Sequence, residues 1–363
     1  MSLDGVGQAG ALAIGVDLGG TKIAAALVSR DGRVLETRQV PTPVESGPGA
    51  VLDRIAAQID QLAGSLAARV PLEGRPRAAL SVAPQATLKL HSDAAVATPL
   101  YGVGIGSPGQ VDSLSGVVRN AVNLGWDEIP LVAEVRQRLT LEIPAWVQKD
   151  ANASALGEYY FGSARSCKDF VYLSIGSGLG GGIVTNGMLV TGADWNAAEL
   201  GHLSLDPDGL LCNCGSRGCA ETVISGPGLL TLVENYLALD ELPTRLSLDQ
   251  ALTTQAILAA AQAGDALALA ALQEVGRQFG IVMAVCVAAL NPERIIVGGG
   301  LGLAAYETLL PAARAELRRR VLPVSYRKLQ ILPSTLASSA VGAACLVWYF
   351  LEKWNLYKEK EVV

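Results

Sequence analysis

The chain of 363 residues is poor in charged, aromatic and histidine side chains. Charged residues make up 17% of it, aromatic residues 5%, and only two residues are histidine. Hydrophobic residues reach 50%, which excludes a disordered chain and is enough for the two cores expected at this length. The net charge is −6 and no basic run is present, so we expect no nucleic-acid partner.

Long apolar segments are also missing. The most apolar stretches, residues 281–290 and 340–351, are shorter than the roughly 20 residues that span a membrane, so we expect buried helices there. Residues 1–10 lack the charged and then apolar pattern of a secretory leader. Three of the six cysteines fall within residues 212–219, which favours metal binding over disulfides in a leaderless chain. We therefore expect a cytoplasmic protein without a membrane partner.

Glycine, in contrast, is abundant, and many of the 40 glycines are clustered. The first cluster lies between two apolar runs, 11–16 and 23–28, and a third run follows at 34–40, which predicts three strands joined by turns. The residues of the first turn are Asp17, Gly19, Gly20, Thr21 and Lys22. Its glycines would let the backbone approach phosphate oxygens, and Asp17 could hold a hydrated Mg²⁺. A plain hairpin is the alternative.

A second copy of this pattern begins at the apolar run 171–175. Residues 176–182 contain five glycines, with Ser177 at the tip, which is more glycine than a plain hairpin needs and indicates a phosphate cradle that includes Gly178. The repeat predicts two related α/β lobes that face each other across a cleft. A third cluster, Gly298 to Gly300, follows the β-branched run 294–297 and suits an adenosine-binding lip.

Asp150 lies where a strand-like segment, 146–148, passes into a helical pattern. An aspartate at the start of a helix is common for structural reasons alone. The functional interpretation is a general base, because a sugar hydroxyl is a poor nucleophile until a carboxylate accepts its proton.

The strongest local pattern is a set of one histidine and three cysteines. The set comprises His202, Cys212, Cys214 and Cys219. This composition suits a tetrahedral structural zinc, although three unconnected buried cysteines would be the alternative. Two carboxylates, Glu199 and Glu221, bracket the set and could accept hydrogen bonds from sugar hydroxyls. The second ring nitrogen of His202 could face a sugar hydroxyl while the first binds the metal.

These motifs together resemble the ROK family of repressors, open reading frames and sugar kinases. The most specific part is Glu-x-Gly-His at 199–202 followed by Cys-x-Cys-Gly-x-x-Gly-Cys-x-Glu at 212–221, and the segments 104–109, 123–126 and 150–158 also fit in order. The resemblance implies ATP-dependent phosphorylation of a hexose such as glucose or of an N-acetylhexosamine, in a protein that forms a homodimer or a higher homo-oligomer.

The resemblance also implies a fold, the duplicated actin-like or ribonuclease H-like α/β fold of the hexokinase type, with two lobes and a central cleft. Residues 11–150 would form the smaller N-terminal lobe, on which a C-terminal helix of about 346–363 would pack back. Residues 151–345 would form the larger lobe with the zinc loop. An insertion at 71–98, which contains His91, lies outside the resemblance.

Roles for individual residues follow from the same resemblance. Asp150 would be the catalytic base. The residues implied to contact the sugar are Gly109, Asn123, Lys149, Glu199, His202 and Glu221. Those implied to bind ATP and Mg²⁺ are Asp17, Gly19, Gly20, Thr21, Lys22, Ser177, Gly178, Gly298, Gly299 and Gly300. Those implied to bind zinc are His202, Cys212, Cys214 and Cys219.

Two alternatives to a kinase stay open at this point. Kinases of the family usually have Asn where this chain has Lys149, so a sugar-binding protein without catalysis is one alternative. A sugar-responsive repressor is the other, but only about ten residues precede the first predicted strand, too few for a helix-turn-helix module. The sequence does not select among glucose, N-acetylmannosamine, N-acetylglucosamine, fructose and allose as the hexose.

Overall fold

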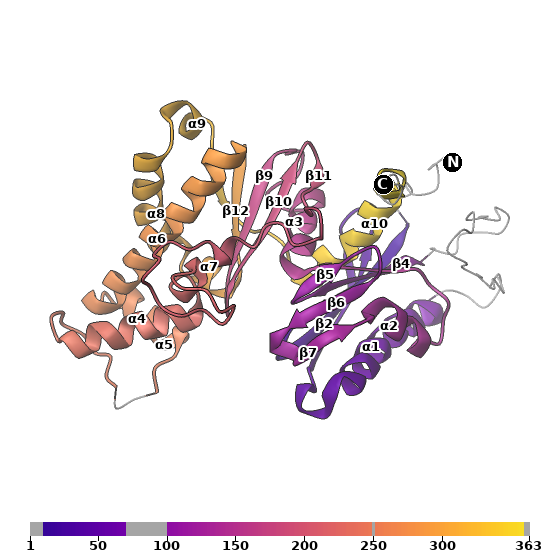
Figure 1. The fold of residues 1–363 in the computed structure, drawn as a ribbon. Helices are drawn as coiled ribbons and strands as arrows, with labels where there is room; N and C mark the ends of the chain where they lie inside the picture. Colours follow the sequence, from indigo (N-terminus) through magenta and orange to yellow (C-terminus); the bar gives the residue numbers. More distant parts are fainter. Residues whose placement is uncertain (1–9, 70–99, 249–250, 359–363) are drawn as a thin grey trace. The chain divides into compact units, whose positions relative to one another are not determined.

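The computed structural model describes residues 10–69, 100–248 and 251–358 (Figure 1). The expected insertion at 71–98, with His91, falls outside these residues. The chain divides into two compact units, each of which is considered by itself. Unit 1 lies within Met1–Gly162, Gly192–Asn196 and Leu336–Val363, and unit 2 within Ser163–Thr191 and Ala197–Thr335.

The centre of unit 1 is a five-stranded sheet in the order β3-β2-β1-β4-β8. Its strands are β1 (Leu12–Leu18), β2 (Lys22–Ser29), β3 (Val34–Pro41), β4 (Leu100–Ser107) and β8 (Ala145–Lys149). The first three strands form the predicted antiparallel meander, while β4 runs parallel to β1 and β8 parallel to β4. The carboxyl ends of β1, β4 and β8 therefore meet at one edge of the sheet.

Helices cover both faces of this sheet. They are α1 (Gly47–Arg69), α2 (Leu131–Arg138), α3 (Asp150–Tyr160) and α10 (Ser339–Lys358). Successive side chains of β1 point to opposite faces of the sheet, and both faces are apolar. Ile14 and Val16 pack in the cluster that includes α1 and α2, and Ala13 packs in the cluster that includes α10. A small sheet adds β5 (Gln110–Asp112), β6 (Val117–Ala121) and β7 (Trp126–Ile129), none of which was predicted.

The C-terminal helix begins at Ser339, close to the start of the buried helix expected at 340–351 and before the 346 expected for the helix that packs back. Its small residues Ala340 and Ala344 pack closely on β1. The first unit also extends past the boundary expected at residue 150. It keeps α3, which packs against α10, and runs to Gly162.

Unit 2 repeats the sheet of unit 1, in the order β11-β10-β9-β12-β13. Its strands are β9 (Phe170–Ile175), β10 (Leu179–Thr185), β11 (Met188–Leu189), β12 (Arg294–Gly298) and β13 (Gln330–Pro333). Again three antiparallel strands are followed by two parallel ones. Asn186 and Gly187, with φ of 51° and 71°, make the tight turn between β10 and β11. The predicted duplication of an α/β fold is confirmed by this common topology.

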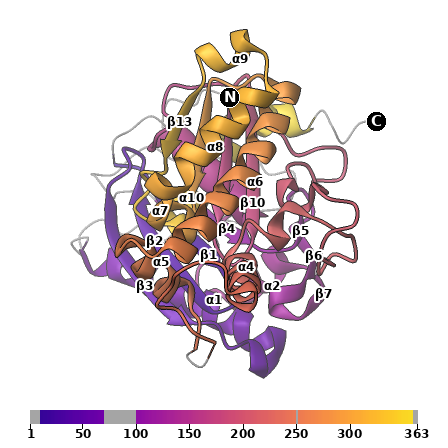
Figure 2. The ribbon, with the colours of Figure 1, turned by 90° about the vertical axis from the view of Figure 1, so that its left-hand side faces the viewer.

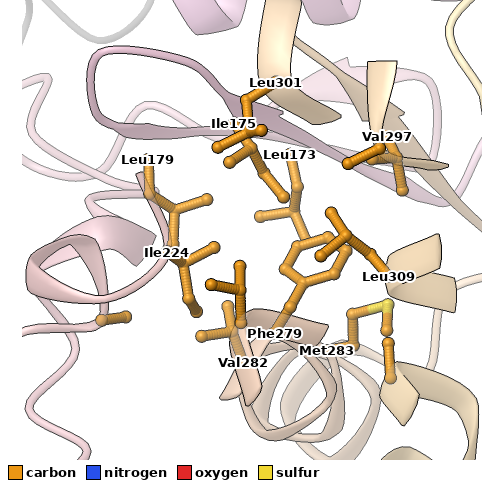
Figure 3. Close-up of a cluster of buried hydrophobic side chains, with 14 of the residues drawn as sticks. Leu173, Ile175, Leu179, Ile224, Phe279, Val282, Met283, Val297, Leu301 and Leu309 are labelled. Carbon is orange, nitrogen blue, oxygen red and sulfur yellow. The ribbon is translucent and has the colours of Figure 1, made fainter. Parts of the chain in front are cut away.

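The core of unit 2 lies between its sheet and a layer of helices. The helices of the unit are α4 (Gly226–Leu239), α5 (Thr254–Gln262), α6 (Ala266–Leu290), α7 (Gly300–Ala304), α8 (Tyr306–Arg320) and α9 (Pro323–Arg327). Leu173 and Ile175 of β9 face Phe279 and Met283 of α6 (Figure 3). Helices α6 and α8 lie side by side (Figure 2). By length and composition α6 could cross a bilayer, but 61% of its most apolar window is buried inside the protein.

Candidate functional site

In unit 1 the first glycine-rich turn connects β1 to β2 and is anchored on both sides. The Gly19 N–H donates to the Lys22 carbonyl at 2.9 Å, and the Thr42 hydroxyl donates to the Gly19 carbonyl at 2.7 Å. A Cβ added at Gly20 would lie 3.0 Å from the Asn123 carbonyl oxygen. The predicted phosphate turn and the predicted sugar residue Asn123 are therefore neighbours, with Thr21, Lys22 and Asn123 all exposed.

Asp17 lies at the carboxyl end of β1, beside this turn. Its Oδ2 accepts a hydrogen bond from the Ser339 hydroxyl at the start of α10. Burial raises the pKa of the Asp17 carboxyl, while the hydrogen bond from Ser339 and the charge of Lys22 act in the opposite direction. The sequence alone could not identify Ser339 as the partner of Asp17, because the two residues are 322 positions apart and Ser339 belongs to no recognisable motif.

Asp17 and Asp150 flank Gly106, near the carboxyl ends of neighbouring parallel strands. A Cβ added at Gly106 would lie 3.8 Å from Asp17 Oδ1 and 3.5 Å from the Asp150 Cα. Gly106 pairs with Asp17 on one side and with Gln148 on the other. The structure thus places the Asp17 carboxylate and the backbone of Asp150 next to the same residue, at the strand ends where ligands bind in α/β folds.

Asp150 is the first residue of α3 and is exposed. Its Oδ1 accepts a hydrogen bond from the Ala151 N–H at 2.6 Å, which orients the carboxylate. The junction between β8 and α3 is held by Gln148. Its Oε1 accepts hydrogen bonds from the Lys149 N–H at 2.8 Å and from Asn152 Nδ2 at 3.2 Å. Sequence reasoning missed both supports, although Gln148 ends the strand-like segment 146–148 and Asn152 belongs to the segment 150–158.

Lys149 and Gly109, the two other residues of unit 1 predicted to contact the sugar, are both closely surrounded by other residues. Lys149 is 7% exposed, which leaves little of its surface for a ligand. Gly109 ends the turn between β4 and β5 with φ of 89°, and a Cβ there would lie 2.7 Å from the Arg119 carbonyl oxygen. Only glycine suits that conformation and that approach.

In unit 2 the second glycine-rich turn connects β9 to β10. The Gly176 N–H donates to the Gly178 carbonyl at 2.9 Å, and Ser177 is exposed at the tip, as predicted. The third glycine cluster packs against the residue before this turn. A Cβ added at Gly299 (φ 81°) would lie 2.6 Å from the carbonyl carbon of Ile175, the last residue of β9. Gly298 ends β12 and Gly300 begins α7. The segments predicted for phosphate and for adenosine are therefore adjacent within unit 2.

The histidine and the three cysteines converge, as their spacing predicted. One ligand atom from each of His202, Cys212, Cys214 and Cys219 lies within 4.8 Å of the others. His202 Nδ1 is 3.7 Å from Cys212 Sγ, and the two remaining sulfurs are 3.6 Å apart. His202 directs Nδ1 toward the thiols and leaves Nε2 for another partner. The donor set and its compactness fit one tetrahedral metal ion of the size and softness of zinc.

The thiols of this cluster differ in acidity. A hydrogen bond from the Ser216 N–H lowers the pKa of Cys214, whereas burial raises the pKa of Cys219 to about 12. A bound cation would stabilise both as thiolates and offset the cost of burying the second one.

The two bracketing carboxylates adjoin the cluster. Glu199 precedes a 3₁₀ turn, Leu200–His202, in which the His202 N–H donates to the Glu199 carbonyl at 3.1 Å. Glu221 belongs to a second 3₁₀ turn, Ala220–Thr222, and its Oε2 accepts from the Leu179 N–H at 2.9 Å. The second contact was not predicted, because Leu179 is an ordinary apolar residue in the sequence.

Comparison with known proteins agrees with these observations. The ROK family model matches residues 13–72 and 85–349, and the chain therefore belongs to the ROK family. It is 32% identical over 341 residues to the glucokinase of Halalkalibacterium halodurans, which covers 92% of this chain and 94% of the relative.

Solved structures of the family give the same result. A ROK family glucokinase from Streptomyces griseus, solved in complex with glucose and AMPPNP, is 34% identical, with a TM-score of 0.72 over 93% of this chain and 99% of that one. A ROK family transcriptional regulator is 27% identical, with a TM-score of 0.77 over 97% of this chain and 81% of that one. The duplicated kinase fold is thus shared by catalytic and regulatory members.

Proposed function

We propose that this protein transfers the terminal phosphoryl group of ATP to a hexose, with glucose as the first candidate. One observation carries the proposal, namely that the Asp17 carboxylate and the backbone of Asp150 both lie next to Gly106, near the carboxyl ends of β1, β4 and β8. Phosphoryl transfer requires a metal-bound triphosphate and an oriented hydroxyl, and these two carboxylates suit the two tasks. The similarity to glucokinases supports glucose as the acceptor.

Asp150 would accept the proton of the sugar hydroxyl. The Ala151 N–H donates to its Oδ1 and so orients the carboxylate, and the exposure of the side chain leaves room for the sugar. Gln148 would keep the carboxylate in place by fixing the backbone between β8 and α3. Lys149, being buried, would act on the junction more than on the sugar.

The glycine-rich turns would bind the nucleotide. In unit 1, Gly19 to Lys22 would contact phosphate oxygens, and Asp17 would hold Mg²⁺, which neutralises charge on the phosphates when bound. In unit 2, Ser177 and Gly178 would contact phosphate as well. Gly298 to Gly300 would contact the adenosine. All of these segments end strands or join them, where backbone N–H groups can face an anion.

The residues that we propose for contact with the sugar are Gly109 and Asn123 in unit 1, and Glu199, His202 and Glu221 in unit 2. The His202 ring would offer Nε2 to a sugar hydroxyl, since Nδ1 faces the thiols. Zinc bound by His202, Cys212, Cys214 and Cys219 would fix the position of that ring and of the loop that carries the two glutamates.

A coupled assay of ADP release tests the proposal. The purified chain is given Mg·ATP with glucose, N-acetylmannosamine, N-acetylglucosamine, fructose or allose, one at a time. We expect glucose to give the highest kcat/KM, with each ADP matched by one phosphorylated sugar. If no hexose stimulates ADP release while glucose still binds by calorimetry, the protein is a sugar-binding member without catalysis.

A further inference from the structure

The carboxylate of Glu221 lies directly against the second glycine-rich turn. Its Oε2 accepts a hydrogen bond from the Leu179 N–H, the first residue of β10, at 2.9 Å. A Cβ added at Gly178 would lie 3.1 Å from the Glu221 Cδ and nearer still to Oε2. The carboxylate therefore fills the space that a side chain at residue 178 would need.

The turn is tied at its other end to the same short segment. The Gly226 N–H, at the start of α4, donates to the Gly176 carbonyl at 2.7 Å. Residues 221–226 thus hold both ends of the turn, through one side chain and one backbone group. This segment begins two positions after Cys219, the last member of the Cys/His cluster.

This arrangement leaves part of the turn available to a ligand. Among the residues that the structure describes, the N–H groups of Ser177 and Gly178 make no hydrogen bond, whereas those of Gly176 and Leu179 are engaged. Two successive unengaged N–H groups at a turn form a concave site for an anion. Their direction depends on how the turn is held at Leu179.

We propose that Glu221 is a positioning residue for the nucleotide, because it fixes the turn Gly176–Leu179 so that the N–H groups of Ser177 and Gly178 face phosphate. This role is separate from any contact that Glu221 makes with the sugar, and it rests on the proposed function, in which this turn binds ATP. One carboxylate oxygen is held by Leu179, and the other stays available to a hydroxyl.

The test is the affinity for Mg·AMPPNP measured by calorimetry without sugar, so that a sugar contact cannot contribute. Glu221→Ala removes the acceptor and is expected to weaken binding roughly 10-fold, the order of effect of losing a hydrogen bond to a charged group. Glu221→Gln keeps an oxygen that can accept from Leu179 and is expected to restore most of the affinity. Circular dichroism and thermal melting show whether each variant is folded.

A double-mutant cycle with Gly178→Ala makes the test specific. In the wild-type background the added methyl group collides with Glu221 and is expected to weaken Mg·AMPPNP binding. In the Glu221→Ala background the space is free, so the further loss is expected to vanish. Gly176→Ala is the matched control, because a Cβ there meets nothing within 4 Å and so reports the effect of a methyl group on the turn itself.

The outcomes separate the two claims. If Glu221→Ala binds Mg·AMPPNP as tightly as wild type, or if Gly178→Ala costs the same in both backgrounds, Glu221 does not position the turn, and the proposed function stands. If the wild-type chain binds no Mg·AMPPNP at all, the proposed function is wrong, and the inference falls with it.

Discussion

The contact between α10 and the sheet of unit 1 depends on a glycine pair, and this gives a quantitative prediction. Gly15 of β1 and Gly104 of β4 are partners in register, and α10 crosses both. A Cβ added at Gly104 would lie 2.9 Å from the Ala343 carbonyl carbon and 3.0 Å from the Leu346 Cβ, and nearer still to the Ala343 oxygen. Gly104→Ala would disturb this contact directly.

The size of the effect follows from these distances. Carbon atoms pack best at about 3.5–4.0 Å, so the two carbon contacts alone would move α10 away by about 1 Å, and the nearer Ala343 oxygen requires a larger shift. Overpacking typically costs about 1–3 kcal/mol, and the upper part of this range is expected because the nearest atoms are backbone and cannot rotate aside. At roughly 2–4 °C per kcal/mol for a unit of this size, the Tm of unit 1 should fall by about 4–12 °C.

Differential scanning calorimetry measures this change, with Gly64→Ala as the control. Gly64 lies inside α1, and a Cβ there meets nothing within 4 Å, so alanine should stabilise the protein by roughly 0.5–1 kcal/mol. The two Gly→Ala changes should therefore move the transition in opposite directions. A Gly104→Ala protein that melts at or above the wild-type temperature would refute the reasoning.

Two further predictions concern the site. The protein should hold about one zinc per chain, and Cys214→Ser should lose the zinc together with thermal stability. Purified wild-type protein that contains no metal by mass spectrometry and melts normally would contradict this. Ser339→Ala should raise the pKa of Asp17 further, because it removes a hydrogen bond that lowers it. Since Asp17 must be ionised to hold Mg²⁺, the acidic limb of kcat/KM for Mg·ATP should move to higher pH, and a limb that stays in place or moves to lower pH would exclude the role.

Local patterns in the sequence predicted much of the fold. The glycine turn between two apolar runs gave strands β1 and β2 to within two residues at their ends, and the second copy gave β9. Strand β10 begins at Leu179, inside the range 176–182 that was expected to be a turn. The spacing of the cysteines predicted a compact cluster, and the four ligand atoms do converge. These features can be predicted from a single sequence, because they are local or involve residues with distinctive chemistry.

Contacts between distant, ordinary residues could not be predicted in this way. Ser339 reaches Asp17 from 322 residues away, and Glu221 accepts from the backbone of Leu179, whose side chain has no part in the contact. Gly104 was quoted as part of a motif, but its tight packing under α10 follows only from the tertiary structure. The apolar run 340–351 predicted a buried helix close to the start of α10 at Ser339, whereas the family resemblance placed the helix that packs back only from about 346.

The central claim is that Asp150 is the base in ATP-dependent phosphorylation of a hexose, and Asp150→Asn tests it most directly. Asparagine keeps the shape of the side chain and its hydrogen bond to the Ala151 N–H but cannot accept the proton. The measurement is kcat for ADP release at saturating glucose and Mg·ATP, with glucose affinity measured in parallel by calorimetry. We predict a fall in kcat of roughly 10²–10⁴-fold with glucose affinity little changed. A variant that keeps near wild-type turnover would contradict the account.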